Sequence, residues 1–256
     1  MSYDTLTIFQ AFKETADAIG EKVSSGLSWA SRGGHKGQHQ GDIDADKVGI
    51  EVLTGYGFTV FSEESGFTTV TSAGALAGVI AVIDPVDGST NASKGIPFYA
   101  VSLCAVADGK PIVAFVRNLA SGDTYFAEEG GGSTKNGLPI SPSSVTEVSS
   151  AVIGLNGYSD KHLGWAQCRS FGSAALELCM VAEGSLDGYA DLSKASLASW
   201  DILGGVLICL ESGATVMCQD GSRYQASDLE VRKKIVAAGT LELAEELRSK
   251  AFGNLH

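Results

Sequence analysis

Long apolar runs and positive charge are both scarce in this chain of 256 residues. No apolar run reaches about 18 residues, the length that a membrane-spanning helix requires, and the first residues lack the basic and apolar regions of a secretion signal. With 18 Lys and Arg against 30 Asp and Glu, the net charge of −12 argues against a general affinity for nucleic-acid backbones or anionic membranes. We therefore expect a cytoplasmic protein.

Cysteine is also sparse, with five residues and no C-x-x-C pair. An odd number without paired spacing excludes a simple disulfide framework and a thiolate zinc site of the usual kind. Four of the five stand among apolar residues, which predicts buried free thiols in a reducing compartment.

The patterns that are present alternate between helix and strand. Apolar residues recur every three or four positions around Ile8, Phe12 and Ile19, which predicts an amphipathic first helix. A second helix is expected from about Asp44 to Thr54. Between the two helices, the five glycines of Gly26–Gly41 predict a mobile segment that acts as a lid over a neighbouring site.

The later elements follow one another without strict β-α-β alternation and without repeats or an evident linker. Expected strands include "FTVFSE", a central strand over residues 78–83, the pair in "FYAVSLCAVADGKPIVAFVRN" and a last strand "KIVAAG", with apolar helices in "SAALELCMVAEG" and "SWDILGGVLICLES". This arrangement indicates an α+β (layered α/β) fold. We place a soft boundary near residue 145, between an N-terminal α+β subdomain with a metal site (1–145) and a C-terminal α/β subdomain that completes it (146–256).

Four acidic residues stand at the ends of expected elements. Asp84 and Asp87 close the central strand in "AVIDPVDGSTN". Glu63 ends another strand in "FSEESG", and Asp201 opens an apolar helix in "SWDILGG". Each alone is explained as a solvated residue, a turn former or a helix N-cap. Together they indicate side chains that converge on one cleft.

Clustered carboxylates repel one another unless a cation neutralises them. All-oxygen ligands favour Mg²⁺ or Mn²⁺ over Zn²⁺, and two such ions roughly 3.5–4 Å apart suit phosphoryl transfer. The turn Gly88-Ser89-Thr90 that follows the aspartates offers the N–H groups of a helix start to a phosphate. The stretch therefore predicts a metal site beside a phosphate site.

The motifs "SEES", "IDPVDGSTN" and "SWDILGG", in this order, resemble the three signature motifs of the inositol monophosphatase family, whose members are lithium-sensitive, Mg²⁺-dependent phosphatases. The similarity runs from the first helix to beyond Gly213. The segment "RSFGSAALELCMVAEGSLDGYADL" resembles the substrate-side helix and strand of the family. The resemblance implies a five-layered αβαβα sandwich of the sugar phosphatase type, two or three Mg²⁺ ions with Mn²⁺ as a substitute, and a homodimer.

The resemblance also implies a role for each matching position. Glu63, Asp84 and the carbonyl group of Val86 would bind the first ion. Asp84, Asp87 and Asp201 would bind the second.

The phosphate and the attacking water are assigned in the same way. Ser89, which stands where many relatives have Thr, would orient the water together with Glu63. The backbone of Gly88 and Ser89, with Thr90 beside it, would hold the phosphate. Asp44 would act as a catalytic residue that assists a third, weaker ion, and two neighbouring carboxylates remain alternatives for that role: Asp42 and Asp46.

The substrate side resembles a subgroup of the family. The stretch "DLSKASLASWD" is longer than in the animal members and is similar to archaeal enzymes that also accept fructose 1,6-bisphosphate. The resemblance implies that Arg169 and Lys194 contact the substrate, with solvated surface charges as the alternative reading, and that Asp191 contacts a sugar hydroxyl. The start of the substrate-side helix adds three positions: Gly172, Ser173 and Ala174.

The function that follows is hydrolysis of inositol 1-phosphate, fructose 1,6-bisphosphate or both by a metal-activated water. A 3′(2′),5′-bisphosphate nucleotidase is one alternative, although the substrate loop offers few of the basic and aromatic residues that an adenosine site needs. A non-catalytic sugar-phosphate-binding relative is another, although the complete carboxylate set has no physical purpose without turnover. The expected partner is a small phosphorylated sugar or polyol, with neither nucleic acid nor membrane.

Overall fold

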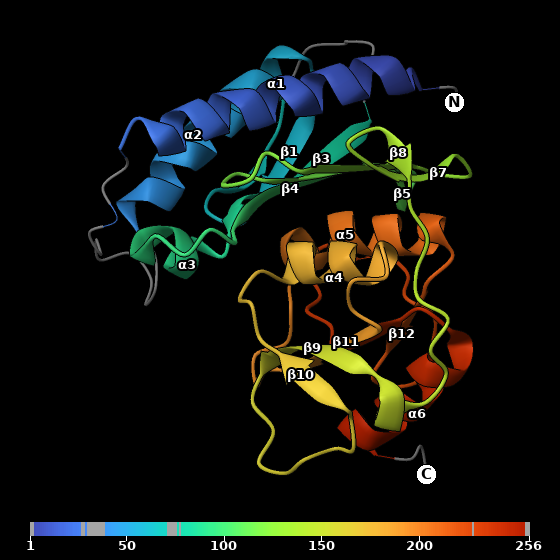
Figure 1. The fold of residues 1–256 in the computed structure, drawn as a ribbon. Helices are drawn as coiled ribbons and strands as arrows, with labels where there is room; N and C mark the ends of the chain where they lie inside the picture. The colour runs from blue at the N-terminus through green and yellow to red at the C-terminus, as the bar shows by residue number, and fades with distance from the viewer. Residues whose placement is uncertain are drawn as a thin grey trace.

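Helices and sheets alternate in five layers, as Figure 1 shows. The computed structural model describes residues 3–26, 29, 39–70, 76, 78–226 and 228–253. The layers are the helices α1 (Thr5–Ser24) and α2 (Gln40–Gly55), an eight-stranded sheet, the helices α4 (Ala174–Ala182) and α5 (Ser199–Ser212), a five-stranded sheet, and the helix α6 (Leu241–Phe252). The expected layered α+β class and the αβαβα sandwich are confirmed.

The first sheet carries the strand ends that matter for the site. Its strands are β1 (Thr59–Ser62), β2 (Gly66–Thr68), β3 (Val79–Asp87), β4 (Ala100–Ala107), β5 (Lys110–Asn118), β6 (Thr124–Glu128), β7 (Gly132–Lys135) and β8 (Leu138–Pro139), in the spatial order β2-β1-β3-β4-β5-β6-β7-β8. Among the described strands of this sheet, only β1 and β3 pair in parallel. Because parallel strands end at the same edge, Ser62 lies opposite Ile83 and the N–H of Glu63 donates to the Ile83 carbonyl at 3.3 Å.

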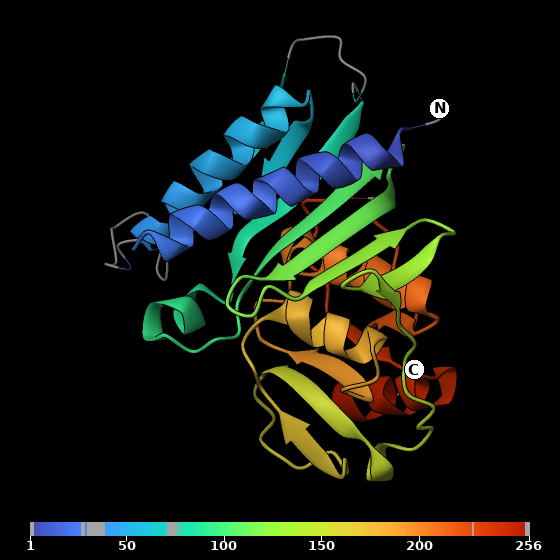
Figure 2. The ribbon, with the colours of Figure 1, turned by 45° about the horizontal axis from the view of Figure 1, so that its top comes forward.

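Helices α1 and α2 cover the outer face of this sheet (Figure 2). The predicted stripe of α1 is buried at Ile8, Phe12 and Ile19, and the helix begins after Asp4, whose side chain accepts from the Leu6 N–H at 3.2 Å. On α2, Gly49 has no side chain, and a Cβ there would lie 3.1 Å from the Ile83 side chain. Helix α2 therefore packs closely on β3, which brings its first turn toward the end of that strand.

The middle layer explains why α5 is apolar around its circumference. It lies beside α4 in the layer between the two sheets, so it has no wide solvent-facing side. Two glycines permit the close approach: a Cβ at Gly204 would lie 2.8 Å from Ser102 Oγ, and one at Gly205 would lie 2.7 Å from Leu178 Cβ. This packing holds the first turn of α5 against the first sheet.

The second sheet completes the molecule. Its strands are β9 (Val152–Gly157), β10 (Gln167–Arg169), β11 (Gly188–Leu192), β12 (Thr215–Cys218) and β13 (Ile235–Ala238), in the order β10-β9-β11-β13-β12, after a short 3₁₀ turn, η1 (Val148–Ser150). Helix α6 buries Leu243 and Leu247 against its outer face. The central strand β11 carries Asp191 near its end, which is why this acidic side chain is fully buried.

Some elements differ from their predicted bounds. The central strand runs through Asp84 to Asp87 because it keeps pairing with β4 past a register shift at this point. Helix α2 begins at Gln40, earlier than expected. The short strands β2, β10 and β12 were not expected, since three or four residues carry little periodic signal.

The first sheet ends at Pro139 and the second begins at Val152, on either side of the predicted boundary near residue 145. Helices α4 and α5 follow that boundary in the chain but pack on both sheets. The division into two subdomains therefore stays a prediction.

The cysteines are all free: three are buried, Cys218 is half-buried and Cys168 is exposed. None of the described helices combines the length and apolarity that crossing a membrane requires. Most of the expected lid, residues 27–28 and 30–38, lies outside the described residues.

Candidate functional site

Three carboxylates meet where β1 and β3 end and α5 begins. One oxygen each from Glu63, Asp84 and Asp201 can be chosen so that all three lie within 4.8 Å of one another. Asp201 is fixed in the first turn of α5, where its Oδ2 accepts from the Ala198 N–H at 2.7 Å. The predicted convergence of these residues on one place is thus present in the fold.

The bulge at the end of β3 orients the two aspartates of the central motif differently. Asp84 is 2% exposed, and its Oδ1 accepts from the Val86 N–H at 3.0 Å. Asp87 reaches the start of α4, where its Oδ2 accepts from Ser173 Oγ at 2.6 Å and from the Ala175 N–H at 2.7 Å. Asp87 therefore links the first sheet to the start of α4.

Burial raises the pKa of every carboxylate in this group, and repulsion within the group raises it further for Glu63, Asp84 and Asp87. Burial of its carboxylate, followed by the charge of Asp201, raises the pKa of Glu63 to about 8. Burial raises the pKa of Asp87 to about 7 despite its hydrogen bond from Ser173, and that of Asp201 to about 6. The pKa of Asp84 is also raised well above its ordinary value, by burial and then by the charge of Glu63.

The donor set of this group fits a divalent cation. Within the part of the chain that the structure describes, none of the four carboxylates forms an ion pair with Lys, Arg or His. Buried carboxylates without a countercharge are costly, and a hard cation that binds oxygen ligands removes that cost. The acidic cluster of Glu63, Asp84, Asp87 and Asp201 is hereafter called the metal centre.

The turn after the metal centre depends on a glycine. Gly88 has a φ of 90° and precedes the short helix α3 (Ser89–Lys94). A Cβ at this position would lie 2.9 Å from the carbonyl oxygen of Gly172 and 3.1 Å from that of Phe98. Asn91 Nδ2 strengthens the same junction by donating to the carbonyls of Phe98 at 2.8 Å and Phe171 at 2.6 Å. The turn and the loop before α4 thus form one packed unit.

We expect Gly88→Ala to lower kcat by about a hundredfold and to destabilise the fold by roughly 1–3 kcal/mol. The added methyl group is strained at this φ and collides with two backbone carbonyls, so the turn must move. Gly95→Ala is the matched control: its φ of 71° imposes similar backbone strain, but nothing lies within 4 Å of the added atom. It should cost about 1 kcal/mol in thermal unfolding and leave kcat unchanged. Equal kcat values in the two variants would contradict this role of Gly88.

Three aspartates on α2 compete for a place beside the metal centre. Asp42 is 5% exposed, its Oδ2 accepts from the His39 N–H at 3.0 Å, and its Oδ1 has no partner among the described residues. Burial raises its pKa to about 6, against the hydrogen bond from the His39 backbone and a smaller lowering influence of the Ser89 hydroxyl. Asp44 instead accepts from Gln40 Nε2 at 2.8 Å. Asp46 accepts from the hydroxyls of Ser62 and Ser65, the residues that flank Glu63-Glu64.

The chain matches the model described as the inositol monophosphatase family over residues 7–253, nearly its whole length. It belongs to the inositol monophosphatase family. The fructose-1,6-bisphosphatase/inositol-1-monophosphatase of Methanothermobacter thermautotrophicus is 36% identical over 220 residues, which are 79% of this chain and 78% of the relative. A protein of the same name from Archaeoglobus fulgidus is 38% identical over 203 residues, 77% of each chain.

Solved structures agree with this assignment. A Pyrococcus horikoshii protein, described as having similarities to inositol-1 monophosphatase, superposes with a TM-score of 0.84 at 27% identity, over 96% of this chain and 99% of that one. The resemblance drawn from three short motifs is therefore confirmed at the level of the family.

The predicted substrate-side residues of this family member fall into two groups. Gly172, Ser173 and Ala174 lie at the start of α4, next to Asp87 and the Gly88 turn. Asp191 is fully buried: its Oδ1 accepts from Asn156 Nδ2 at 3.1 Å and from the Ser193 N–H at 2.9 Å, and its Oδ2 has no partner among the described residues.

The two predicted cations are exposed. The guanidinium of Arg169 folds back on its own strand, donating to the Cys168 carbonyl at 2.8 Å and to Gln167 Oε1 at 2.7 Å. Lys194 lies in the exposed part of the loop after β11. Neither position supports a substrate contact over the alternative reading, a solvated surface charge.

Two residues at the site had not been singled out from the sequence. Glu177, 1% exposed on α4, accepts through Oε1 from the N–H groups of Phe171 at 2.5 Å and Gly172 at 3.2 Å, and so holds the loop against the Gly88 turn. A charged residue inside the apolar run "SAALELCMVAEG" was the available signal. Arg232 lies over the ring of Trp200 at 5.7 Å, and its charge lowers the pKa of Asp201. No sequence signal marks it, because its place depends on the packing of two distant segments.

Proposed function

We propose that this protein is a Mg²⁺-dependent phosphomonoesterase that hydrolyses inositol 1-phosphate, fructose 1,6-bisphosphate, or both. Its family and the names of its relatives make it a phosphoric monoester hydrolase. The observation that supports Mg²⁺-dependent hydrolysis is the convergence of Glu63, Asp84 and Asp201, which can each place one carboxylate oxygen within 4.8 Å of the others. The Gly88 turn, which is suited to bind a phosphate, follows Asp87 directly. The bisphosphate nucleotidase alternative has less support, since the two archaeal relatives are named for the other two substrates.

The residues of the metal centre divide as the family resemblance implies. Glu63, Asp84 and the Val86 carbonyl would hold one Mg²⁺, and Asp84, Asp87 and Asp201 a second, with Mn²⁺ as a substitute. Ions of this kind polarise phosphoryl oxygens and lower the pKa of water. The bulge at Asp84–Asp87 supports this division, because it turns Asp84 toward Glu63 and leaves Oδ1 of Asp87 outside its bonds to α4.

The chain itself supplies the groups that handle the attacking water. Glu63 lies at the solvent-accessible side of the metal centre, where its carboxylate is placed to accept a proton from water. The Ser89 hydroxyl, whose proximity lowers the pKa of Asp42, would donate to the unpartnered oxygen of this carboxylate and so keep a lone pair for that same water. We therefore transfer the role first predicted for Asp44 to Asp42, since Asp44 is engaged by Gln40.

The phosphate and the rest of the substrate would bind on the two sides of the Gly88 turn. The N–H groups of Gly88, Ser89 and Thr90 would hold the phosphoryl oxygens, at a turn that Gly172 packs against. Asp191, with one free buried oxygen, would accept a sugar hydroxyl. Glu177 would act as a positioning residue through the loop that ends at Ser173.

We expect Asp42→Asn to lower kcat by roughly a hundredfold, because an amide accepts the Ser89 proton less well and can present its own donor instead. Asp44→Asn is the matched variant, two residues away on the same helix, and should keep a kcat close to that of the unaltered protein. Steady-state kinetics at saturating Mg²⁺ measure both. A loss confined to Asp44→Asn would restore the role first predicted for that residue.

The function is tested by phosphate release with Mg²⁺ from inositol 1-phosphate, fructose 1,6-bisphosphate and adenosine 3′,5′-bisphosphate. Turnover of either of the first two is expected, with little from the third. Preference for the nucleotide would favour the bisphosphate nucleotidase, and binding of all three without release would favour the non-catalytic relative. From the family resemblance we also propose that Li⁺ inhibits turnover and that the protein is a homodimer, which inhibition curves and analytical ultracentrifugation would measure.

A further inference from the structure

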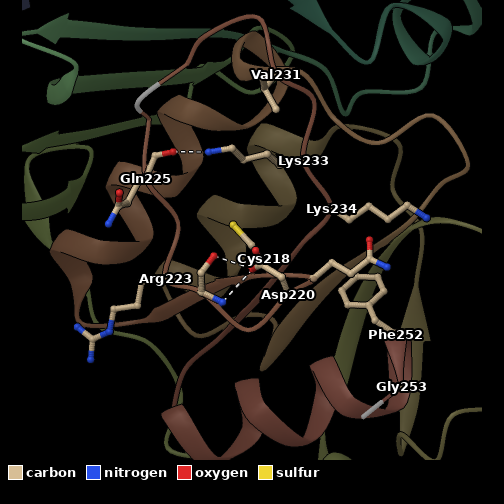
Figure 3. A pocket seen from close by; sticks show the side chains of 11 residues that line it. Cys218, Asp220, Arg223, Gln225, Val231, Lys233, Lys234, Phe252 and Gly253 are labelled. Carbon is tan, nitrogen blue, oxygen red and sulfur yellow. Dashed lines mark hydrogen bonds between the residues drawn. The ribbon is translucent and has the colours of Figure 1, made fainter. Parts of the chain in front are cut away.

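A second cavity, of about 740 Å³, lies at the β12 edge of the second sheet. Its walls come from the segment after β12, from the approach to β13 and from the C-terminal end of α6, as Figure 3 shows. None of the residues of the metal centre or the Gly88 turn lines it. It has the size of a small-molecule site.

The charge of this cavity is opposite to that of the chain. Arg223, Lys233 and Lys234 line it, and among its described lining residues the one acid is Asp220. That carboxylate is engaged in its own turn, where Oδ1 accepts from the Ser222 N–H at 2.9 Å and from Ser222 Oγ at 2.6 Å. None of the three cations forms an ion pair in the described part of the chain. The lining therefore carries an excess of two positive charges in a protein of net charge −12.

The cations are held by different parts of the wall. Lys233 reaches across to donate to the Gln225 carbonyl and lies 4.8 Å from the ring centre of Tyr224. Arg223 and Lys234 extend on opposite sides of the cavity in Figure 3. Phe252, the last residue of α6, adds an apolar surface to the lining. A compact dianion with an organic body matches this combination of charge and apolar surface.

The wall is hydrogen-bonded to the start of α5. Lys233 and Leu197 exchange backbone hydrogen bonds at 2.8 and 3.1 Å, and Ser199 Oγ donates to the Leu229 carbonyl at 2.7 Å. The Ala198 N–H, between these two contacts, donates to Asp201. A ligand that binds Lys233 would therefore act on residues 197–199, the segment that positions Asp201 of the metal centre.

We propose that this cavity is a second site for a small phosphate-bearing anion, and that its occupancy is transmitted through Leu197 to the first turn of α5. The proposal is independent of the substrate of the metal centre. It names Lys233 as the main contact of the dianionic group, with Arg223 and Lys234 on opposite sides of the rim.

The test uses the full chain without metal, because the uncompensated carboxylates of the metal centre then repel anions. Sulfate, as a tetrahedral dianion, is titrated at low millimolar concentration against chloride at equal ionic strength, and binding is followed by hydrogen exchange and thermal unfolding. Sulfate should slow exchange in residues 218–224 and 231–234 and at the amide of Leu197. Lys233→Gln alone, and together with Arg223→Gln, should weaken the apparent Kd at least about tenfold.

Lys47→Gln, which removes an exposed cation on α2, is the matched control and should leave the response unchanged. An equal response in the Lys233 and Lys47 variants would reduce the effect to a general influence of salt and overturn the site. A response to succinate equal to that to sulfate would overturn the assignment to phosphate. Slowed exchange in the wall without any change at Leu197 would overturn the transmission to α5.

Discussion

Asp84→Asn should lower kcat by about a thousandfold or more while the protein remains folded. Asp84 is the carboxylate that the proposed ions share, and one neutral amide oxygen cannot balance two divalent charges. The fold should survive because Asn keeps an oxygen for the Val86 N–H. Without metal the variant should even be more stable than the unaltered protein, since one charge is removed from a group whose members repel one another.

Phosphate release at saturating Mg²⁺ and thermal unfolding in a chelator measure the two halves of this prediction. Asp44→Asn is the control for the loss of an acidic side chain near the site, because its carboxylate is engaged by Gln40. Near-normal turnover of Asp84→Asn at high Mg²⁺ would contradict the proposal that Asp84 is a ligand of both ions. If phosphate release by Asp84→Asn kept its normal dependence on Mg²⁺ while the metal-free variant was unfolded, Asp84 would instead have a structural role.

The second large effect concerns pH. Without metal, Tm should fall by about 10 °C between about pH 5 and about pH 8, and Mg²⁺ should remove most of this fall. Burial raises the pKa of Asp87 from 3.8 to about 7, a difference between the unfolded and folded states that corresponds to about 4 kcal/mol. Burial also raises the pKa values of Asp201 to about 6 and of Glu177 to about 7.

The direction follows from proton binding. Below about pH 4 these carboxyls are protonated in both states and cost nothing. As the pH rises, the unfolded chain releases its protons first, whereas the folded chain retains them or places charges in a buried group. The free energy of unfolding therefore decreases as the pH rises from the ordinary carboxyl pKa of 3.8 to the folded-state values of about 6 to about 7. A bound divalent cation compensates the charges that cause this decrease.

Calorimetry with a chelator, and again with Mg²⁺, measures this dependence. Asp87→Asn should flatten the metal-free curve, whereas Asp160→Asn, which alters an exposed carboxylate, should not. A Tm that rises toward about pH 8 in the absence of metal would contradict the prediction, and so would equal curves with and without Mg²⁺.

The sequence predicts the metal-binding half of the site better than the substrate-binding half. "IDPVDGST" predicts carboxylates at a strand end followed by a tight turn, and the structure places Asp84, Asp87 and Gly88 in that arrangement. Local signals suffice here, because strand, turn and glycine are neighbours in the chain. Arg169 shows the opposite case: the family resemblance implied a substrate contact, whereas its guanidinium donates to Cys168 and Gln167 of its own strand.

The positions of several side chains could not be predicted from the sequence, because they depend on how whole helices are rotated and packed. The period of α2 does not say which of Asp42, Asp44 and Asp46 faces Ser89, because that depends on how the helix lies on β3 at Gly49. The burial of Glu177 and the place of Arg232 over Trp200 likewise depend on contacts between segments far apart in the chain.

The sequence by itself determined the family, the layered fold class and the three segments that supply the metal centre, because each of these is written in short motifs and apolar periods. Only the tertiary structure decided which oxygens meet. It brought Asp201 close to Glu63 and Asp84, and it hydrogen-bonded Asp87 to Ser173 and Asp44 to Gln40. The physical reason is that spacing along a chain sets the face of an element, whereas the distance between side chains on different elements is set by how closely those elements pack.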